Sequence, residues 1–225
     1  IIHPAICPPG NGPYVTIRRF PDTIFSLKKL VSLGALSDEM AEFMGNVIRL
    51  RYSTVISGGT GTGKTSTLNA LSGAIPPFES IITIEDTAEL RLHPKRDVRP
   101  MLTKRGNDET GKGAITIRDL VKASLRMRPD RIVVGEVRDG AAYDLMQALN
   151  TGHDGSMTTV HANNAAGCIE RLENLIMEAN EGLGPSQVLG LIATGVDLIY
   201  TIKRFEDGSR RCSGIYEVPS HIDVE

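Results

Sequence analysis

The sequence is poor in cysteine and has no long apolar run. The first feature argues against a zinc site, and the second argues against a membrane-spanning protein. Its three cysteines, Cys7, Cys168 and Cys212, lie far apart, without the CxxC or Cys/His spacing of a zinc site. We therefore expect isolated, buried thiols in a protein of a reducing compartment. No apolar stretch approaches the roughly 20 residues of a membrane-spanning helix, and the opening IIHP is neither a signal peptide nor an initiator methionine. The sequence thus predicts a soluble protein and reads as an excised fragment.

The sequence also lacks an excess of positive charge. Lysine and arginine number 25 and aspartate and glutamate 27, which gives a formal net charge of -2. Binding to a nucleic-acid backbone depends on a basic surface, so the composition predicts no nucleic-acid partner. Hydrophobic residues at 40% and charged residues at 23% are ordinary for a globular protein and exclude collagen-like, disordered and disulfide-stapled chains.

Two regions of the 225 residues differ in character. Residues 1–21 combine turn-forming Pro and Gly with one β-rich stretch, Tyr14 to Arg19, which is predicted to be a strand but is too little for a domain. We interpret this region as the remnant of an N-terminal domain with its linker. Residues 22–225 are long enough for one sizeable domain.

Strands and helices alternate through this second region. Ser37 is predicted to begin a helix that packs on a sheet, because apolar residues recur at helical spacing between Met40 and Ile48. The predicted strands cover 54–57, 81–85, 131–136 and 157–160, and the predicted helices cover 64–72, 117 onward after a Thr116/Asp119 cap, 141–150 and 165–179. The alternation predicts an α/β fold with a mostly parallel sheet, helices on both faces, and ligands at the carboxyl ends of the strands. A hairpin over 197–218, turning at Asp207-Gly208, is expected to add an antiparallel edge.

One motif between the first of these strands and its helix is specific for phosphate. It satisfies GxxxxGK[ST], and the residues we expect to contact nucleotide are Gly58, Gly59, Thr60, Gly61, Thr62, Gly63, Lys64, Thr65 and Ser66. The glycines allow backbone N–H groups and the helix N-terminus to face a phosphate. Lys64 is predicted to reach the β and γ phosphates, and Thr65 to give its hydroxyl to Mg²⁺.

Acidic residues follow two other predicted strands. Glu85-Asp86 ends one of them and Glu136 ends another, so both acids are expected where a nucleotide lies. Phosphoryl transfer to water needs one carboxylate for the Mg²⁺ shell and another that orients or deprotonates the water. The alternative for each acid taken alone is a capping or solvated carboxylate.

Two histidines bracket the strand over 157–160. His161 at its end is a candidate donor to a γ-phosphate, and a purely structural histidine fits the residues equally well. His153 fits best as a turn residue that orders its loop.

Taken together, four ordered segments resemble a known family. The segments are Gly58 to Thr65, Ile84-Glu85-Asp86, Arg126 to Arg138, and Gly152 to Asn163. They resemble the ATPases of type II/IV secretion and pilus assembly, which share a Walker A motif, an acidic "Asp box", a Walker B motif ending in Gly-Glu and a "His box". The resemblance covers Pro13 to about Val218 and points most strongly to the Tad/Cpa (CpaF-like) pilus-assembly branch.

The resemblance implies a RecA-like P-loop NTPase fold over 22–225 and hydrolysis of ATP with Mg²⁺. It implies that Glu85 activates water, that Glu136 is the Walker B acid at the metal, and that His161 senses the γ-phosphate. It also implies an arginine that reaches a neighbour's nucleotide, for which Arg18 is the candidate, with Arg126 and Arg128 as weaker ones. The role of the polar, Gly-rich insert at 104–113 cannot be read from it.

The resemblance further implies partners and a location. The partners are other copies of the chain in a homo-oligomer, expected to be a hexameric ring, and an inner-membrane platform protein of a secretion or pilus system. The implied location is cytoplasmic, at the inner face of the bacterial membrane. A nucleotide-binding scaffold with little turnover is the alternative function, and a P-loop kinase or GTPase is disfavoured because no [NT]KxD segment is present.

Overall fold

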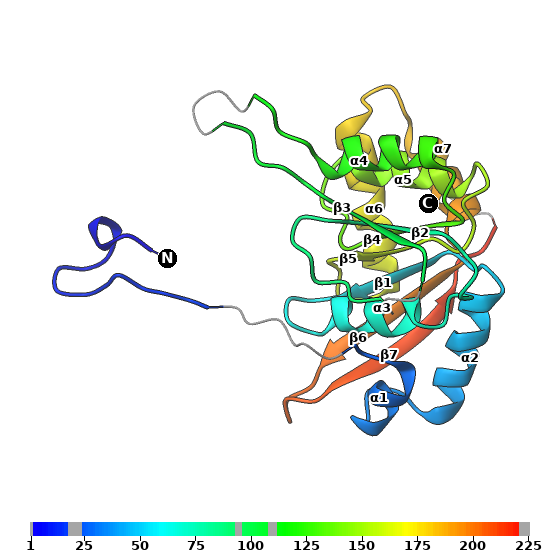
Figure 1. Cartoon of the computed structure of the whole chain (residues 1–225), viewed down its shortest axis with the longest axis horizontal. Coiled ribbons are helices and arrows are strands. Elements are labelled where there is room, and N and C mark those ends of the chain that lie inside the picture. The colour runs from blue at the N-terminus through cyan, green and yellow to red at the C-terminus, as the bar shows by residue number, and fades with distance from the viewer. Residues whose placement is uncertain (1, 18–23, 93–95, 108–111, 221–225) are drawn as a thin grey trace.

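Strands in the described part of the chain form one sheet, ordered β3-β2-β4-β5-β1-β6-β7 (Figure 1). The structure is a computed structural model that describes residues 2–17, 24–92, 96–107 and 112–220. The strands are β1 (Thr54–Gly58), β2 (Ile81–Glu85), β3 (Val98–Leu102), β4 (Arg131–Val134), β5 (Met157–Val160), β6 (Leu198–Arg204) and β7 (Arg210–Glu217). All pairings are parallel except β6 with β7, as the predicted hairpin requires. The predicted fold class is confirmed.

Helices cover both faces of the sheet (Figure 1). They are α1 (Leu27–Ser32), α2 (Asp38–Arg49), α3 (Lys64–Ser72), α4 (Ile117–Ser124), α5 (Ala141–Leu149), α6 (Ala165–Ala179) and α7 (Pro185–Gly195), with short 3₁₀ turns at Pro4–Ile6 and Leu125–Met127. Helices α1 to α3 pack with Ile56 and Val133 on one face, and α4 to α7 pack with Val55 and Val134 on the other. Since side chains alternate along a strand, neighbouring residues enter opposite layers and the central strands are buried at every position.

Several predicted helix starts are confirmed by their capping contacts. Ser37 Oγ accepts a hydrogen bond from Met40 N at 3.1 Å. Thr116 and Asp119 form the reciprocal contacts of a capping box at the start of α4. A capped first turn satisfies backbone N–H groups that the helix itself leaves unpaired. These caps fix where α2 and α4 begin.

The predicted strand over residues 14–19 is wrong for its described part. Tyr14 makes one isolated antiparallel bridge to Ile2, and residues 15–17 are in no strand. Residues 2–17 lie away from the layered part of the chain in Figure 1, so the β-rich composition has no sheet to join there. Arg18 and Arg19 lie outside the described residues.

Three elements were not predicted, namely β3, α1 and α7. β3 is an edge strand that carries Pro100, and its sequence is only partly apolar. The strand predicted at 131–136 ends at Val134, two residues before Glu136. No helix in the described ranges is long and apolar enough to cross a membrane.

A buried ion pair holds the amino ends of the strands. The Arg131 side chain at the start of β4 is fully buried, and its guanidinium donates to both carboxylate oxygens of Glu79 and to Gly155 O at 3.1 Å. A Cβ on Gly155 would lie 2.4 Å from Arg131 Nη1, so only glycine leaves room for the guanidinium. The site described next lies at the opposite, carboxyl edge of the sheet.

Candidate nucleotide site

Four adjacent strand ends bring the predicted site residues together. Strands β2, β4, β5 and β1 are neighbours in the sheet and run parallel, so their carboxyl ends meet at one edge. Glu85 ends β2, Glu136 follows β4, His161 follows β5, and the glycine-rich loop follows β1. Residues up to about 100 positions apart in sequence therefore border one space, as expected for ligand binding in open α/β sheets.

The loop between β1 and α3 is shaped by glycine. A Cβ on Gly58 would lie 2.6 Å from Thr62 Oγ1 and 2.7 Å from Ile202 O, so a side chain cannot fit there. Gly63 has a φ of 100° and directly precedes α3, a conformation that other residues rarely adopt. Thr62 Oγ1 donates to Gly59 O at 2.9 Å and closes the loop. The loop thus presents the N-terminus of α3 to the site.

The Lys64 ammonium lies at the centre of this loop. Its Nζ donates to Gly58 O at 3.0 Å and Gly59 O at 3.1 Å, and both ring nitrogens of His161 lie 3.2 Å away. Because an ammonium only donates, the facing imidazole nitrogen accepts and the ring is neutral. Burial and the charge of Lys64 lower the pKa of His161, in agreement with this neutral ring. Burial also lowers the pKa of Lys64, and the nearby charge of Glu136 opposes that shift.

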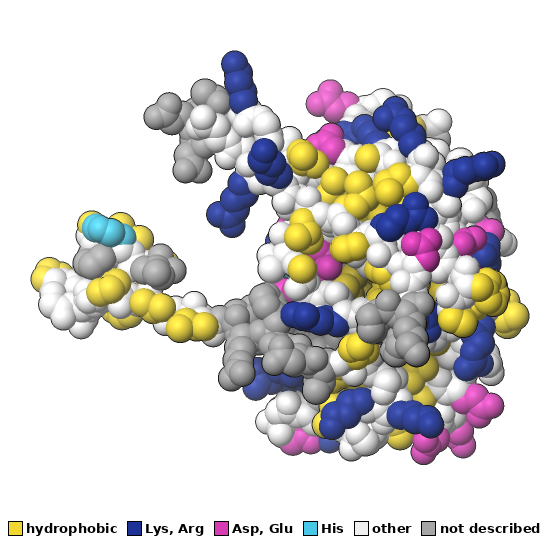
Figure 2. All heavy atoms as spheres, viewed as in Figure 1, with side chains coloured by type: hydrophobic (Ala, Val, Ile, Leu, Met, Phe, Trp, Pro, Cys, Tyr) yellow, Lys and Arg dark blue, Asp and Glu magenta, His cyan; other side chains and the backbone are white. Residues whose placement is uncertain are grey.

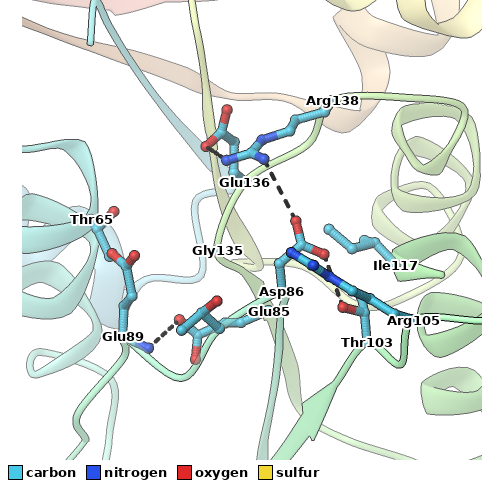
Figure 3. A pocket seen from close by; sticks show the side chains of 11 residues that line it. Thr65, Glu85, Asp86, Glu89, Thr103, Arg105, Ile117, Gly135, Glu136 and Arg138 are labelled. Carbon is cyan, nitrogen blue, oxygen red and sulfur yellow. Dashed lines mark hydrogen bonds and ion pairs between the residues drawn. The ribbon is translucent and has the colours of Figure 1, made fainter. Parts of the chain in front are cut away.

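A chain of charged contacts runs from His161 across the site. His161 Nε2 lies 3.1 Å from Glu136 Oε1, and Arg138 Nη2 donates to Glu136 Oε2 at 2.8 Å. Arg138 Nη1 lies 3.7 Å from Asp86 Oδ2, and Thr103 Oγ1 donates to Asp86 Oδ1 at 3.1 Å (Figure 3). Burial acts to raise the pKa of Glu136, but the Arg138 hydrogen bond, the neighbouring His161 and the charges of Arg138 and Lys64 hold it below its ordinary value.

Glu85 lies in a different environment from Glu136. Its side chain is only 5% exposed, and Oε1 accepts backbone hydrogen bonds from Glu89 at 3.0 Å and Leu90 at 2.9 Å. Burial raises the pKa of Glu85, although the two backbone hydrogen bonds oppose the shift. Gly135 packs against it, since a Cβ there would lie 3.1 Å from Glu85 Cγ. The site therefore holds two carboxylates whose pKa values are shifted in opposite directions, a pattern typical of separate acid–base roles.

Glu85, Glu136 and Arg138 border a cavity of about 470 Å³ (Figure 3). Its lining includes Thr65 from the loop, the acids Glu85, Asp86, Glu89 and Glu136, and the cations Arg105 and Arg138. A second hollow of about 230 Å³ lies on the other side of the loop and α3. It is lined by apolar Phe25, Leu30, Leu33 and Ile202 together with Thr62, Gly63, Ser66, Thr67 and Arg210.

Oxygen donors for a hard cation are present in the first cavity. Thr65 and Glu136, the two residues predicted at the metal, both line it. Within the described ranges no group of three or more His, Cys, Asp or Glu could hold a metal alone. That donor set fits Mg²⁺, which typically takes one or two protein oxygens and completes its shell with phosphates and water.

Other predicted residues lie away from this edge or outside the description. Arg126 and Arg128 are exposed at the amino end of β4. His153 lies in the turn before β5, where its backbone N and Nδ1 both lie 3.3 Å from Ala148 O, as a structural histidine would. Arg18 is not among the described residues. The cysteines are free, with Cys168 buried and Cys7 and Cys212 partly buried.

The sequence did not single out Arg138, Thr103 or Arg105 for this site. Arg138 follows Glu136 in the quoted motif, so an arginine two residues after a strand-end acid was the available signal. Thr103 and Arg105 follow β3, which the sequence did not predict, so nothing placed them beside Glu85. In the structure, Thr103 N donates to Glu85 O at 3.0 Å, and this bond brings the residues after β3 to the site.

Comparison with known proteins gives consistent matches. A family model described as "Type II/IV secretion system protein" matches residues 4–213. The conjugal transfer protein TrbB of Rhizobium radiobacter is 38% identical over 203 residues, which are 89% of this chain and 59% of that protein. The chain thus spans about 59% of the length of this curated relative.

Two solved structures share the fold. The VirB11 ATPase of the Brucella suis type IV secretion system, solved with sulphate, matches with a TM-score of 0.71 and 29% identity, covering 85% of this chain and 54% of that one. The pilus retraction motor PilT, solved with bound ADP, matches with a TM-score of 0.68 and 27% identity, covering 90% and 55%.

Proposed function

The chain belongs to the family of type II/IV secretion system proteins, and from that premise we propose that it binds and hydrolyses ATP as the motor domain of a secretion or pilus machine. One observation carries the proposal. The phosphate loop, the two differently perturbed carboxylates and the neutral histidine follow four adjacent parallel strands. Thr65 and both carboxylates line one cavity, and His161 contacts Lys64 and Glu136 beside it. A phosphate site alone would need only the phosphate loop.

Nucleotide binding begins with the loop after β1. Backbone N–H groups at the start of α3 face the phosphates, and phosphate oxygens compete with Gly58 O, Gly59 O and His161 for the Lys64 ammonium. Release of the imidazole from Lys64 leaves His161 beside Glu136, where it can respond to the γ-phosphate. The sulphate and ADP in the two related structures support an anionic, adenine-nucleotide ligand.

The base is proposed to occupy the smaller hollow beside the loop. Its apolar side chains, Phe25, Leu30 and Leu33 among them, suit a flat aromatic ring, and it adjoins Gly63 at the start of α3. This places the base and the triphosphate on opposite sides of the loop. The arrangement directs the γ-phosphate of a bound nucleoside triphosphate toward Glu85 and Glu136, and the ADP bound to PilT favours ATP as that nucleotide.

Hydrolysis is assigned to Glu85. A water oxygen forms a bond to the γ-phosphorus while the bond from that phosphorus to the β–γ bridging oxygen breaks, and the water proton passes to Glu85. A carboxylate with a raised pKa is a stronger base than an ordinary glutamate, which suits this transfer. Mg²⁺, held by Thr65 and Glu136, would neutralise charge on the phosphates when bound. Glu136 suits that role because its low pKa keeps it ionised.

The wider assembly follows from the family. We propose a homo-oligomeric ring, hexameric in the whole protein, that works at the inner face of the bacterial membrane with an inner-membrane platform protein. Residues 1–21 are proposed to belong to an N-terminal domain with its linker, and Arg18 to reach a neighbour's nucleotide. The Tad-type pilus branch stays a prediction, because the curated relative described above is a conjugal transfer protein.

A single-turnover assay tests the proposal against the scaffold alternative. The purified chain, in excess over radiolabelled ATP and with Mg²⁺, is expected to release phosphate. Glu85→Gln is expected to bind ATP without releasing phosphate. Bound ATP that stays intact on the wild-type chain, both alone and in the longer protein, would favour a nucleotide-binding scaffold. Failure to bind ATP would reject the nucleotide site altogether.

A further inference from the structure

An arm of the chain projects beside the catalytic cavity. We define the arm as residues 103–107 and 112–116, which leave β3 and return to α4 (Figure 1). Its two sides pair through Lys104 and Ile115, which exchange backbone hydrogen bonds of 3.0 and 2.8 Å. Asn107 N donates to Lys112 O at 3.0 Å further along. Figure 2 shows basic side chains gathered on the part of the molecule that projects in this direction.

The base of the arm is fixed to the two acids after β2. Leu102 is paired with Glu85 in the β2–β3 register, and Thr103 N donates to Glu85 O. Thr103 Oγ1 donates to Asp86 Oδ1 at 3.1 Å. Arg105 follows two residues later, so its backbone starts from a position set by the proposed catalytic base itself. In Figure 3 its side chain points from the arm into the cavity, whose lining includes it.

The charges of the cavity leave Arg105 available to a ligand. Arg138 is already paired with Glu136 at 2.8 Å and lies 3.7 Å from Asp86. Arg105, by contrast, has no ion-pair or hydrogen-bond partner within the described ranges, and it is exposed. A guanidinium held beside four carboxylates without pairing to one is placed to meet an incoming anion. Its planar set of donors suits phosphate oxygens.

We infer that Arg105 contacts the γ-phosphate of the nucleotide bound to its own subunit and stabilises the charge that develops there during hydrolysis. The inference rests on the proposed ATPase function and adds a cation that the polar insert contributes in cis. Arginines that meet the transferring phosphate are worth large factors in rate because they stabilise the transition state more than the ground state. Lys104 cannot serve instead, since it is absent from the cavity lining, which includes Arg105.

The test compares affinity for two nucleotides with turnover in four proteins. Dissociation constants for ADP and for an ATP analogue with an imido β–γ bridge are measured for the wild-type chain, Arg105→Ala, Arg105→Lys and Lys104→Ala. We expect Arg105→Ala to weaken analogue binding about 10-fold or more, to leave ADP affinity within about 2-fold, and to lower kcat about 100-fold or more. Arg105→Lys should recover part of the loss, and Lys104→Ala should match the wild type.

Each other outcome is decisive. Equal loss for ADP and the analogue, or no loss for either, would overturn the contact with the γ-phosphate. A wild-type chain that binds neither nucleotide would instead reject the proposed function. Mixing Arg105→Ala with Lys64→Ala separates action within a subunit from action between subunits, because activity restored by mixing would mean that Arg105 serves a neighbour and would overturn the cis assignment.

Discussion

His161 Nε2 lies 3.1 Å from Glu136 Oε1, while both ring nitrogens of His161 lie 3.2 Å from Lys64 Nζ. One neutral imidazole therefore joins the cation of the phosphate loop to the acid after β4. Any ligand that draws Lys64 toward itself changes the partner of His161 and, through it, the environment of Glu136. The predictions below test the groups of this arrangement separately.

Lys64→Ala is expected to abolish nucleotide binding. Its ammonium is the charge that the phosphate loop offers to the β and γ phosphates, and burial within that loop directs it there. Isothermal calorimetry with ATP measures the effect. Lys122→Ala, on α4 away from the cavity, is the matched control and should bind as the wild type does. Undiminished affinity in Lys64→Ala would be incompatible with the phosphate-loop assignment.

Glu85→Gln is expected to lower kcat about 100-fold or more while MgATP affinity stays within a few-fold, the usual effect of losing a positioned base. In the wild type, kcat should fall as the pH decreases through the pKa of Glu85, since the base must be ionised. Because that pKa is raised, the decline should begin at a higher pH than for an ordinary glutamate near 4.3. Glu42→Gln on the exposed side of α2 is the control. A wild-type rate in Glu85→Gln would move the base to Asp86.

Glu85→Gln is also expected to stabilise the fold at neutral pH. A carboxyl whose pKa is raised in the folded state is favourable to folding when protonated, so the wild type loses stability as the pH rises through that pKa. Glutamine keeps the acceptor for Glu89 N and Leu90 N without the buried charge. Melting temperatures of the variant and the wild type should differ at pH 7 and converge below about pH 4. Curves that coincide at every pH would show that the charge costs the folded state nothing.

Arg138→Ala is expected to raise the pKa of Glu136. The hydrogen bond from Arg138, together with its charge, is the main influence that lowers the pKa of Glu136 against the effect of burial. Glu136 must be ionised to serve Mg²⁺, so the acidic limb of the pH dependence of Mg²⁺ affinity, measured with bound nucleotide, should move to higher pH in the variant. Arg138→Lys, which keeps the charge, should shift less. An identical limb in all three proteins would mean that Arg138 does not control this acid.

Glu79→Gln is expected to destabilise the chain by about 3–5 kcal/mol, because it leaves the fully buried Arg131 without its countercharge. Urea unfolding measures the change in the free energy of unfolding. Asp207→Asn removes a partner of the exposed Asp207–Arg211 pair and should cost far less, because water screens an exposed pair. Comparable losses in the two variants would mean that burial adds nothing to the Arg131 pair.

The sequence predicted those parts of the fold whose local signals agree with their tertiary setting. Thr116 with Asp119 gave the start of α4, and the apolar runs before Glu85 and Glu136 gave the buried strands. These local patterns did not predict the order of the strands in the sheet. That order depends on the crossover connections between strands, which local sequence does not determine. That order is what places His161 between Lys64 and Glu136.

The predictions failed where composition and environment disagree. Val98–Leu102 contains Arg99 and Pro100 and is only partly buried, so β3 lacks the apolar run of a central strand. Tyr14 to Ile17 has strand-forming residues but no adjacent sheet. Because the sequence does not predict β3, it gives Thr103 and Arg105 no position, and the role of the polar insert at 104–113 cannot be read from it.

Pro100 has a consequence for how the molecule meets copies of itself. β3 is one open edge of the sheet, and a proline there offers no amide hydrogen for a further strand to bind. Arg99 beside it adds charge to the same edge. Stray strand addition, the usual route by which exposed sheet edges aggregate, is thereby discouraged on the side next to the proposed catalytic base. A second copy that met the chain on that side would be held by side chains and loops, which separate more readily than a continuous sheet.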